Sequence, residues 1–191
     1  MLDDANFNVE QWISQWLAED FADASAADYI NGDGVQEAHG VTGDANIAHV
    51  ASGSATLITL AGMVRLYMGV KPAYRSRGTF AMNGTTLTNL YLLSNGVSQP
   101  YMLPDIRQGV GFTFLGRPIL EFPDLPNEGA STFPVYFGDW NQGYYIVDRQ
   151  DMSMLRDPFS SKPYVLFYTT WRTGGRVAKA EALCKLECAT S

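Results

Sequence analysis

The sequence predicts an α+β fold, with helices in the first half of the chain and mostly antiparallel strands in the second. Apolar residues recur every three to four positions in the first half, and alternate with period two from about residue 109 onward. The chain has 191 residues, of which 46% are hydrophobic and 13% aromatic. This composition excludes a disordered chain and permits a sizeable core in one or two domains.

Three helices are expected. The first covers residues 8–29, with Asn8 as its N-cap, and stops at the Asn-Gly-Asp-Gly turn of residues 31–34, where glycine permits positive φ. The third covers residues 84–93 and begins after Asn83. The second covers residues 56–68 and has one apolar stripe, made of Leu57, Leu60, Ala61, Val64 and Met68.

Strands follow these helices. The glycine pair at 174–175, between two arginines, suits a hairpin or a bulge. Cys184 and Cys188 lie four residues apart in the last strand, too far for a relaxed disulfide, so both are expected to be free thiols. The polar residues 35–53 form a long loop or a short hairpin. The strands are expected near residues 79–82, 117–122, 133–138, 143–148, 152–156, 164–173 and 178–188.

The charge of the chain is unevenly placed. Residues 1–64 contain ten acidic side chains and no Lys or Arg, whereas residues 65–191 contain 13 basic and ten acidic ones. The acidic segment is either a solvated face or a surface that meets basic segments of another copy. The lack of a dense basic patch disfavours a nucleic-acid reader. The sequence has no apolar run of 18 residues, and its first residues lack the pattern of a signal peptide.

The sequence contains no complete motif for a calcium, zinc, nucleophile or phosphate site. The turn at 31–40 lacks the ligand spacing of an EF-hand. His39 and His49 are the two histidines, and neither belongs to a zinc or nucleophile-elbow pattern. The glycines at 109–116 precede a strand rather than a helix, so they form no phosphate cradle. We therefore expect no catalytic, cofactor-binding or metal-ligating residues, which favours a structural protein.

Five phrases, in this order and spacing, carry a family resemblance: AEDFADASAADYINGDG, YRSRGTFAMNGTTLTNLYLLSNG, FLGRPILEFPDLP, YFGDWNQGYYIVDR and LRDPFSSKPYVLFYTTWRTGGRV. Together they resemble the major capsid protein family of tailed bacteriophages, with the Hong Kong 97-type fold. The resemblance runs from about residue 3 to about residue 190. No single phrase is decisive, but five in register are specific.

The resemblance implies a role for each segment. Residues 1–33 would be the spine helix of a peripheral domain, and residues 34–150 an axial domain that clusters around five-fold and six-fold axes. Residues 151–177 would be the long strands and turn of the peripheral domain. Residues 178–191 would form a C-terminal strand that returns to the axial domain. Family members usually carry a longer N-terminal region, so the chain is expected to be an N-terminally truncated fragment.

The function that the resemblance implies is that of a major capsid (head) subunit of a tailed phage or prophage, without enzymatic activity or cofactor. Copies would form pentamers and hexamers of an icosahedral shell around non-specifically packaged double-stranded DNA. A scaffolding protein, a protease and a portal are further expected partners, and a membrane is not. The expected location is the virion and, before assembly, the cytoplasm of the bacterial host.

Aromatic and arginine side chains are typical anchors of subunit interfaces. The strand near 164–173 is apolar on both faces, so we expect one face to be covered by the spine helix and the other by a neighbouring copy. The residues expected at subunit contacts are Trp12, Trp16, Arg75, Arg77, Trp171, Arg172 and Arg176.

Two other interpretations remain open at this point. One is the related encapsulin, a bacterial compartment shell that packages protein rather than DNA. The other, from a different class, is a small hydrolase whose catalytic triad leaves no sequence motif. Nucleic acid inside purified shells distinguishes the phage capsid from the encapsulin, and activity on generic ester or peptide substrates tests the hydrolase.

Overall fold

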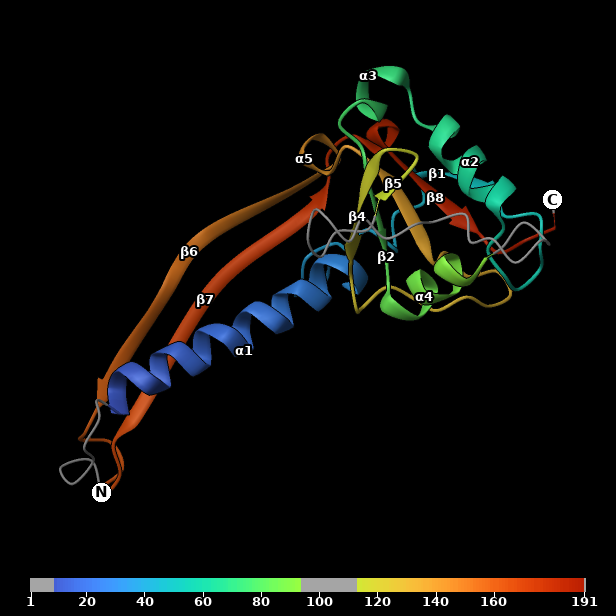
Figure 1. Ribbon diagram of the computed structural model, residues 1–191. Coiled ribbons are helices and arrows are strands. Elements are labelled where there is room, and N and C mark those ends of the chain that lie inside the picture. The colour runs from blue at the N-terminus through green and yellow to red at the C-terminus, as the bar shows by residue number, and fades with distance from the viewer. Residues whose placement is uncertain (1–8, 94–112, 191) are drawn as a thin grey trace. The chain divides into compact units, whose positions relative to one another are not determined.

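The computed structural model describes residues 9–93 and 113–190, and these form an α+β fold of two compact units (Figure 1). Unit 1 comprises residues 1–40 and 146–176, and unit 2 comprises residues 41–145 and 177–191. The chain therefore passes between the units three times, after residues 40, 145 and 176. Each unit is made of segments that are far apart in the sequence.

Unit 1 consists of one long helix and a two-stranded ribbon. Helix α1 (Val9–Asn31) lies along the ribbon of β6 (Tyr144–Asp157) and β7 (Leu166–Val177) (Figure 1). The ring centres of Phe21 and Trp171 lie 6.2 Å apart in an edge-to-face arrangement. The hydroxyls of Tyr29 and Thr173 share a hydrogen bond of 2.6 Å. These contacts attach α1 to one face of β7.

The end of α1 lies where the glycines predict it. The helix stops at Asn31, Gly34 follows with φ +80°, and the Gly40 N–H donates to the carbonyl of Gly32 at 2.9 Å. The glycine pair at 174–175 does not form the expected hairpin, and the alternative, a bulge, stays a prediction. The pair lies inside β7, and the Gly175 carbonyl accepts a 2.8 Å hydrogen bond from the His39 N–H, which fixes the loop after α1 to the strand.

Unit 2 contains a mixed six-stranded sheet in the order β1-β8-β5-β2-β4-β3. The pairs β1–β8 and β2–β4 are parallel, and the other three pairs are antiparallel. The last strand of the chain therefore lies between two strands of the first three-quarters. The strands are β1 (Ala48–Ala51), β2 (Thr79–Met82), β3 (Thr113–Phe114), β4 (Arg117–Glu121), β5 (Val135–Gly138) and β8 (Leu183–Glu187).

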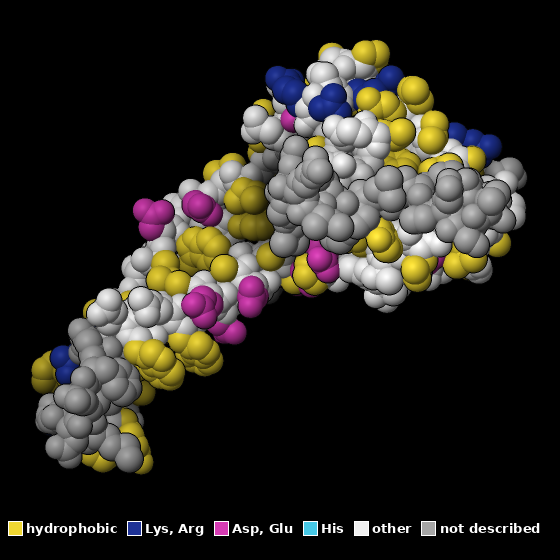
Figure 2. Space-filling model, in the orientation of Figure 1, with side chains coloured by type: hydrophobic (Ala, Val, Ile, Leu, Met, Phe, Trp, Pro, Cys, Tyr) yellow, Lys and Arg dark blue, Asp and Glu magenta, His cyan; other side chains and the backbone are white. Residues whose placement is uncertain are grey.

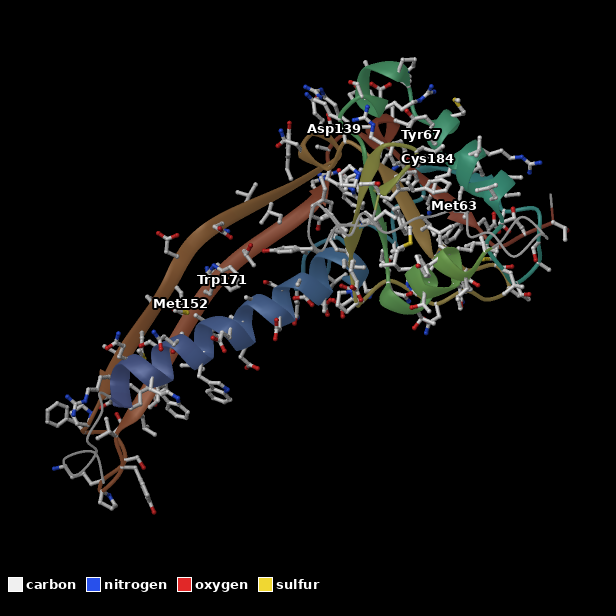
Figure 3. The ribbon with its side chains drawn as sticks, in the orientation of Figure 1. Met63, Tyr67, Asp139, Met152, Trp171 and Cys184 are labelled. Atoms are coloured by element: carbon white, nitrogen blue, oxygen red, sulfur yellow. The ribbon has the colours of Figure 1, made fainter. Side chains whose placement is uncertain are left out.

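Two helices, α2 (Leu60–Gly69) and α4 (Gly84–Leu92), cover one face of this sheet and close the core. At its centre the rings of Phe80 and Phe137 lie 4.3 Å apart, and both side chains are fully buried. Met63 and Tyr67 of α2 approach the sheet near Cys184 (Figure 3). The remaining short helices are α3 (Pro72–Arg75), α5 (Trp140–Gly143) and the 3₁₀ turn Ala180–Ala182.

The helix caps explain where α2 and α4 begin. The Thr59 hydroxyl accepts from the Gly62 N–H at 3.0 Å, and the Asn83 side chain accepts from the Thr86 N–H at 2.7 Å. The cap at Asn83 confirms the expected start of the third helix. The cap at Thr59 starts α2 four residues later than the predicted residue 56, because Leu57 and Ile58 precede the capped turn.

The apolar stripe expected on this helix was the wrong one. Met63 and Leu66 are buried in the core, whereas Val64 and Met68 of the predicted stripe face solvent. Both faces of α2 are apolar, so spacing alone does not identify the inner face. Asn8, the expected cap of the first helix, lies outside the described residues.

Three strand predictions also need correction. The strands expected near 143–148 and 152–156 form one continuous strand, β6, because no turn interrupts the residues between them. The strand expected near 178–188 is shorter, because residues 180–182 form a 3₁₀ turn before β8. Cys184 and Cys188 are free thiols, as the sequence predicts. The structure adds that both are buried, and burial raises the pKa of the Cys184 thiol to about 11.

Candidate subunit-contact surfaces

Helix α1 presents two tryptophans to solvent. Trp12 and Trp16 are each 56% exposed and lie one helical turn apart, on the same side of the helix. Acidic side chains occur along the same helix, and Figure 2 shows hydrophobic and acidic groups next to each other there. Two large exposed aromatic side chains in one stripe are typical of a surface that another protein covers.

Among the described residues, α1 covers one face of the ribbon of unit 1 and leaves the other face uncovered. Trp171 points toward α1 and is half-buried, whereas Tyr168 and Arg172, which alternate with it, are exposed (Figure 3). On β6, Leu155 is also exposed, and Ser153 shares a 2.9 Å hydrogen bond with Thr170 across the ribbon. The uncovered face therefore combines apolar, hydroxyl and cationic groups.

The turn between β6 and β7 holds an aromatic side chain in solvent. The Asp157 carboxylate accepts hydrogen bonds from the Ser160 hydroxyl and from the N–H groups of Phe159 and Ser160. The hydroxyl bond of Ser160, followed by the Phe159 N–H, lowers the pKa of Asp157. This turn presents Phe159, which is 79% exposed, and Tyr164 at its end is exposed as well.

The two arginines expected at contacts in unit 2 have partners within their own copy. Arg75 donates to the carbonyls of Met68 and Val70 at 2.8 Å, and its guanidinium lies 5.3 Å from the ring centre of Tyr67. The guanidinium of Arg77 lies 3.0 Å from the buried carboxylate of Asp139. Both side chains therefore stabilise unit 2, and 61% of the Arg77 side chain remains exposed to solvent.

A charged cluster of Lys71, Tyr74 and Glu181 joins α3 to the 3₁₀ turn. The Lys71 ammonium and the Tyr74 hydroxyl both donate to the Glu181 carboxylate, the latter at 2.8 Å. The hydrogen bond from Lys71, and then that from Tyr74, lowers the pKa of Glu181. The same hydrogen bond raises the pKa of Lys71. All three groups are solvent-accessible, so this cluster positions surface charge.

The sequence analysis did not predict that one lysine of the sheet is buried. Lys185 on β8 is almost fully buried, its ammonium donates to the Asp44 carbonyl at 3.1 Å, and it lies 4.3 Å from the ring centre of Phe133. Burial lowers the pKa of Lys185. The alternation of β8 contains the signal, since Lys185 stands between the core residues Cys184 and Leu186.

The two histidines belong to different units. His39 belongs to the loop of unit 1, and His49 lies on β1 of unit 2, 3.4 Å from the Glu187 carboxylate and edge-on to Phe133. Within residues 9–93 and 113–190, no three His, Cys, Asp or Glu side chains gather closely enough to hold a metal ion. In the same residues, no helix combines the length and apolarity needed to cross a bilayer.

An α+β chain with its aromatic side chains turned outward on a helix and a ribbon is typical of a structural protein that associates with other subunits. The sequence places it more narrowly, because residues 1–188 match the phage capsid family. The chain belongs to the phage capsid family and is a major capsid subunit. No protein with curated annotation matches the chain.

Solved structures agree with this assignment. The chain is 33% identical to the capsid protein of an empty GTA particle computed with C5 symmetry, with a TM-score of 0.90 over 98% of this chain and 69% of that one. The capsid of the native GTA particle matches with the same identity and TM-score over 68% of its chain. Both alignments extend through the two units, because they cover nearly all of this chain.

Two more distant structures share the fold. An encapsulin from Synechococcus elongatus PCC 7942 is 14% identical, with a TM-score of 0.67 over 98% of this chain and 69% of that one. Gordonia phage Cozz is also 14% identical, with a TM-score of 0.63 over 95% of this chain and 64% of that one. At this identity the likeness concerns the fold alone.

Proposed function

We propose that copies of this subunit form a closed icosahedral shell that encloses double-stranded DNA, as the head of a tailed phage or prophage. The carrying observation is the apolar surface that unit 1 leaves uncovered, on α1 and on one face of the ribbon. A shell buries such surface between subunits and thereby stabilises itself. The C5 symmetry with which the GTA capsid structures were computed supports a ring of five copies as one building block.

In this proposal the two units have different places in the shell. Unit 2 is the axial part, which surrounds the five-fold and six-fold axes, and unit 1 is the peripheral part, which contacts neighbouring rings. This division keeps the segment roles implied by the sequence, with residues 34–150 and 178–191 mainly axial and residues 1–33 and 151–177 peripheral. A unit with its own core suits the rigid ring, and an elongated helix and ribbon suit contacts that wrap a neighbour.

The residues proposed at subunit contacts differ in the support that the structure gives them. Trp12 and Trp16 are exposed, and Arg172 and Arg176 stand on the uncovered side of β7. Trp171 would affect subunit contacts indirectly, because its ring packs on Phe21 and holds the ribbon against α1. Arg75 and Arg77 remain proposed contact residues on the surface of unit 2, where their internal partners fix their position.

The charge of the subunit suits non-specific containment of DNA. The net charge of −7 provides no excess of cations that would hold phosphates tightly. Packaged DNA is retained by a closed shell and needs few direct contacts. Assembly in the host cytoplasm, with a scaffolding protein, a protease and a portal as partners, completes the proposed role.

Electron microscopy of the full-length gene product tests the proposal. Uniform closed shells that retain nuclease-resistant DNA are the expected result. Shells that contain protein cargo and no nucleic acid would instead identify an encapsulin-type compartment, which the shared fold permits. A folded protein that stays dispersed, both alone and with the products of neighbouring genes, would contradict a shell-forming role.

A further inference from the structure

Exposed large hydrophobic side chains of unit 2 occur near both ends of its strand order. One group lies on and just before α2 and comprises Leu57, Val64 and Met68. The other lies on the β3–β4 hairpin and comprises Leu115 and Leu120. Among the described residues of this unit, the other exposed large hydrophobic residues are Leu92, at the end of α4, and Tyr145, where the chain enters unit 1.

The first edge, called here the α2 edge, is apolar and basic. Helix α2 packs over β1 and β8, and β1 is the terminal strand of the sheet on that side. Its outer stripe contains Ala61, Val64, Arg65 and Met68, with Met68 58% exposed. Figure 2 shows basic and hydrophobic side chains next to each other over α2 and α3.

The second edge, called here the β4 edge, is apolar and acidic. Strand β3 pairs with Arg117 and Pro118 alone, so the rest of β4 has no strand on its outer side among the described residues. Leu120 there is 46% exposed, and the exposed residue Glu121 follows it, with one carboxylate oxygen next to Gly84 of its own copy. The cation of this edge, Arg117, donates to the Ser76 carbonyl of its own copy.

The two edges stand at opposite ends of the strand order, so they do not meet within one copy. Each offers apolar groups of similar size, and their charges are opposite. Binding to a different protein would require only one of these edges. In a ring of identical subunits, each contact joins two different patches head to tail, so every copy needs both edges.

We propose that the α2 edge of one subunit binds the β4 edge of the next subunit around the axis of each ring. In this contact, Val64 and Met68 pack against Leu120, and Arg65 faces Glu121. The inference rests on the proposed function, because it assigns the contact surfaces of the axial part of the shell.

Site-specific crosslinking tests the head-to-tail contact. The variants Val64→Cys and Leu120→Cys place reactive thiols at the two edges, while Cys184 and Cys188 are buried. With a short bismaleimide, the double variant should give a ladder of oligomers and a mixture of the two single variants should give dimers. Each single variant alone should give none. The matched control combines Val64→Cys with Asn141→Cys on α5, outside both edges, and should give no ladder.

The outcomes separate the two claims. Wild-type shells without a ladder in the double variant would overturn the paired edges and leave the shell intact. Crosslinking of Val64→Cys with itself would overturn them too, because it requires a symmetric contact. A wild-type protein that forms no shells would overturn the proposed function, and this inference with it.

Charge reversal gives an independent measurement. Arg65→Glu and Glu121→Lys should each reduce the yield of shells by about tenfold or more, because each brings like charges together. The double variant restores opposite charges and should recover most of the yield. Lys179→Glu, on an exposed side chain bonded to Gln142 of its own copy, should leave the yield unchanged. Failure of the double variant to recover, with each single variant folded, would contradict the Arg65–Glu121 pairing.

Discussion

The two units of the chain differ in where they place their apolar side chains. Among the described residues, unit 1 buries the hydrophobic side chains of Ile30 and Ala38, and all other buried hydrophobic residues belong to unit 2. The exposed tryptophans and most exposed aromatic residues belong to unit 1. Unit 2 thus completes its core within one copy, whereas unit 1 needs contacts with other copies to remove its apolar surface from water.

This difference separates folding from assembly within one chain. The core of unit 2 supplies the free energy of folding, and the uncovered surface of unit 1 is available for association. Substitutions in unit 2 should therefore change subunit stability most, and substitutions in unit 1 should change shell yield most. Four variants test this contrast, beginning with the largest expected effect on stability.

The first variant, Phe80→Ala, removes a ring from the centre of the unit 2 core. Phe80 is fully buried and packs on Phe137 at 4.3 Å and on Phe114 at 5.6 Å. We expect the free energy of unfolding to fall by about 3–5 kcal/mol. Urea denaturation monitored by Trp140, the tryptophan of unit 2, measures this loss. A loss below about 1 kcal/mol would contradict the assignment of Phe80 to the core.

The second variant, Trp171→Ala, tests unit 1. The substitution removes the half-buried ring that packs on Phe21, so we expect a local loss of about 1–2 kcal/mol and a strong fall in shell yield. Tyr168→Ala on the uncovered face is the matched control and should leave subunit stability within about 0.5 kcal/mol while also lowering the yield. Negative-stain particle counts and urea midpoints give both quantities. Normal assembly of Trp171→Ala would remove this residue from the proposed contacts.

The third variant, Arg77→Ala, tests whether an expected subunit-contact residue stabilises the fold of unit 2. It leaves the carboxylate of Asp139, 5% exposed, without its cation, and should cost about 1–2 kcal/mol. Adding Asp139→Asn removes the unpaired charge and should recover part of the loss, which a double-mutant cycle in urea detects. Unchanged stability with reduced shell yield would instead assign Arg77 to the subunit contact alone.

The sequence predicted the elements of both units better than it predicted their faces. The end of α1 and the start of α4 follow from local chemistry, because a glycine turn and an Asn cap specify them. The inner face of α2 does not, because Met63 and Leu66 alternate with Val64 and Met68 around an apolar helix. The non-local sheet order supplies the missing information, since the position of α2 over β1 and β8 fixes which side is covered.

The candidate contact residues show the same limit. Tryptophans and arginines were chosen by residue type, and Trp12 and Trp16 are exposed as an interface requires. Residue type did not reveal that Arg75 and Arg77 have intramolecular partners. Arg75 bonds to the carbonyls of Met68 and Val70, which are close in sequence, whereas Arg77 pairs with Asp139, which only the fold brings near. Lys185 was missed for a related reason, since its burial depends on Phe133 and Asp44, which the fold brings to it.

The fourth variant, Lys185→Met, has the smallest expected effect and tests the core of unit 2 through pH. The ammonium is buried beside Phe133, with the carboxylates of Asp44 and Glu187 as its charged neighbours, and burial lowers its pKa below the ordinary 10.5. The unfolded chain therefore binds this proton more tightly than the folded chain does.

It follows that the contribution of Lys185 to stability rises with pH between its folded pKa and 10.5, and is constant below that window. At neutral pH the methionine keeps the contact with Phe133 and loses the bond to the Asp44 carbonyl, so the variant should lie within about 1 kcal/mol of the wild type. As pH approaches 10.5, the wild type should gain stability relative to the variant. Urea midpoints of both proteins across this range measure the difference. A trend of the opposite sign for Lys185→Met would mean that the carboxylates of Asp44 and Glu187 affect the pKa of Lys185 more than its burial does.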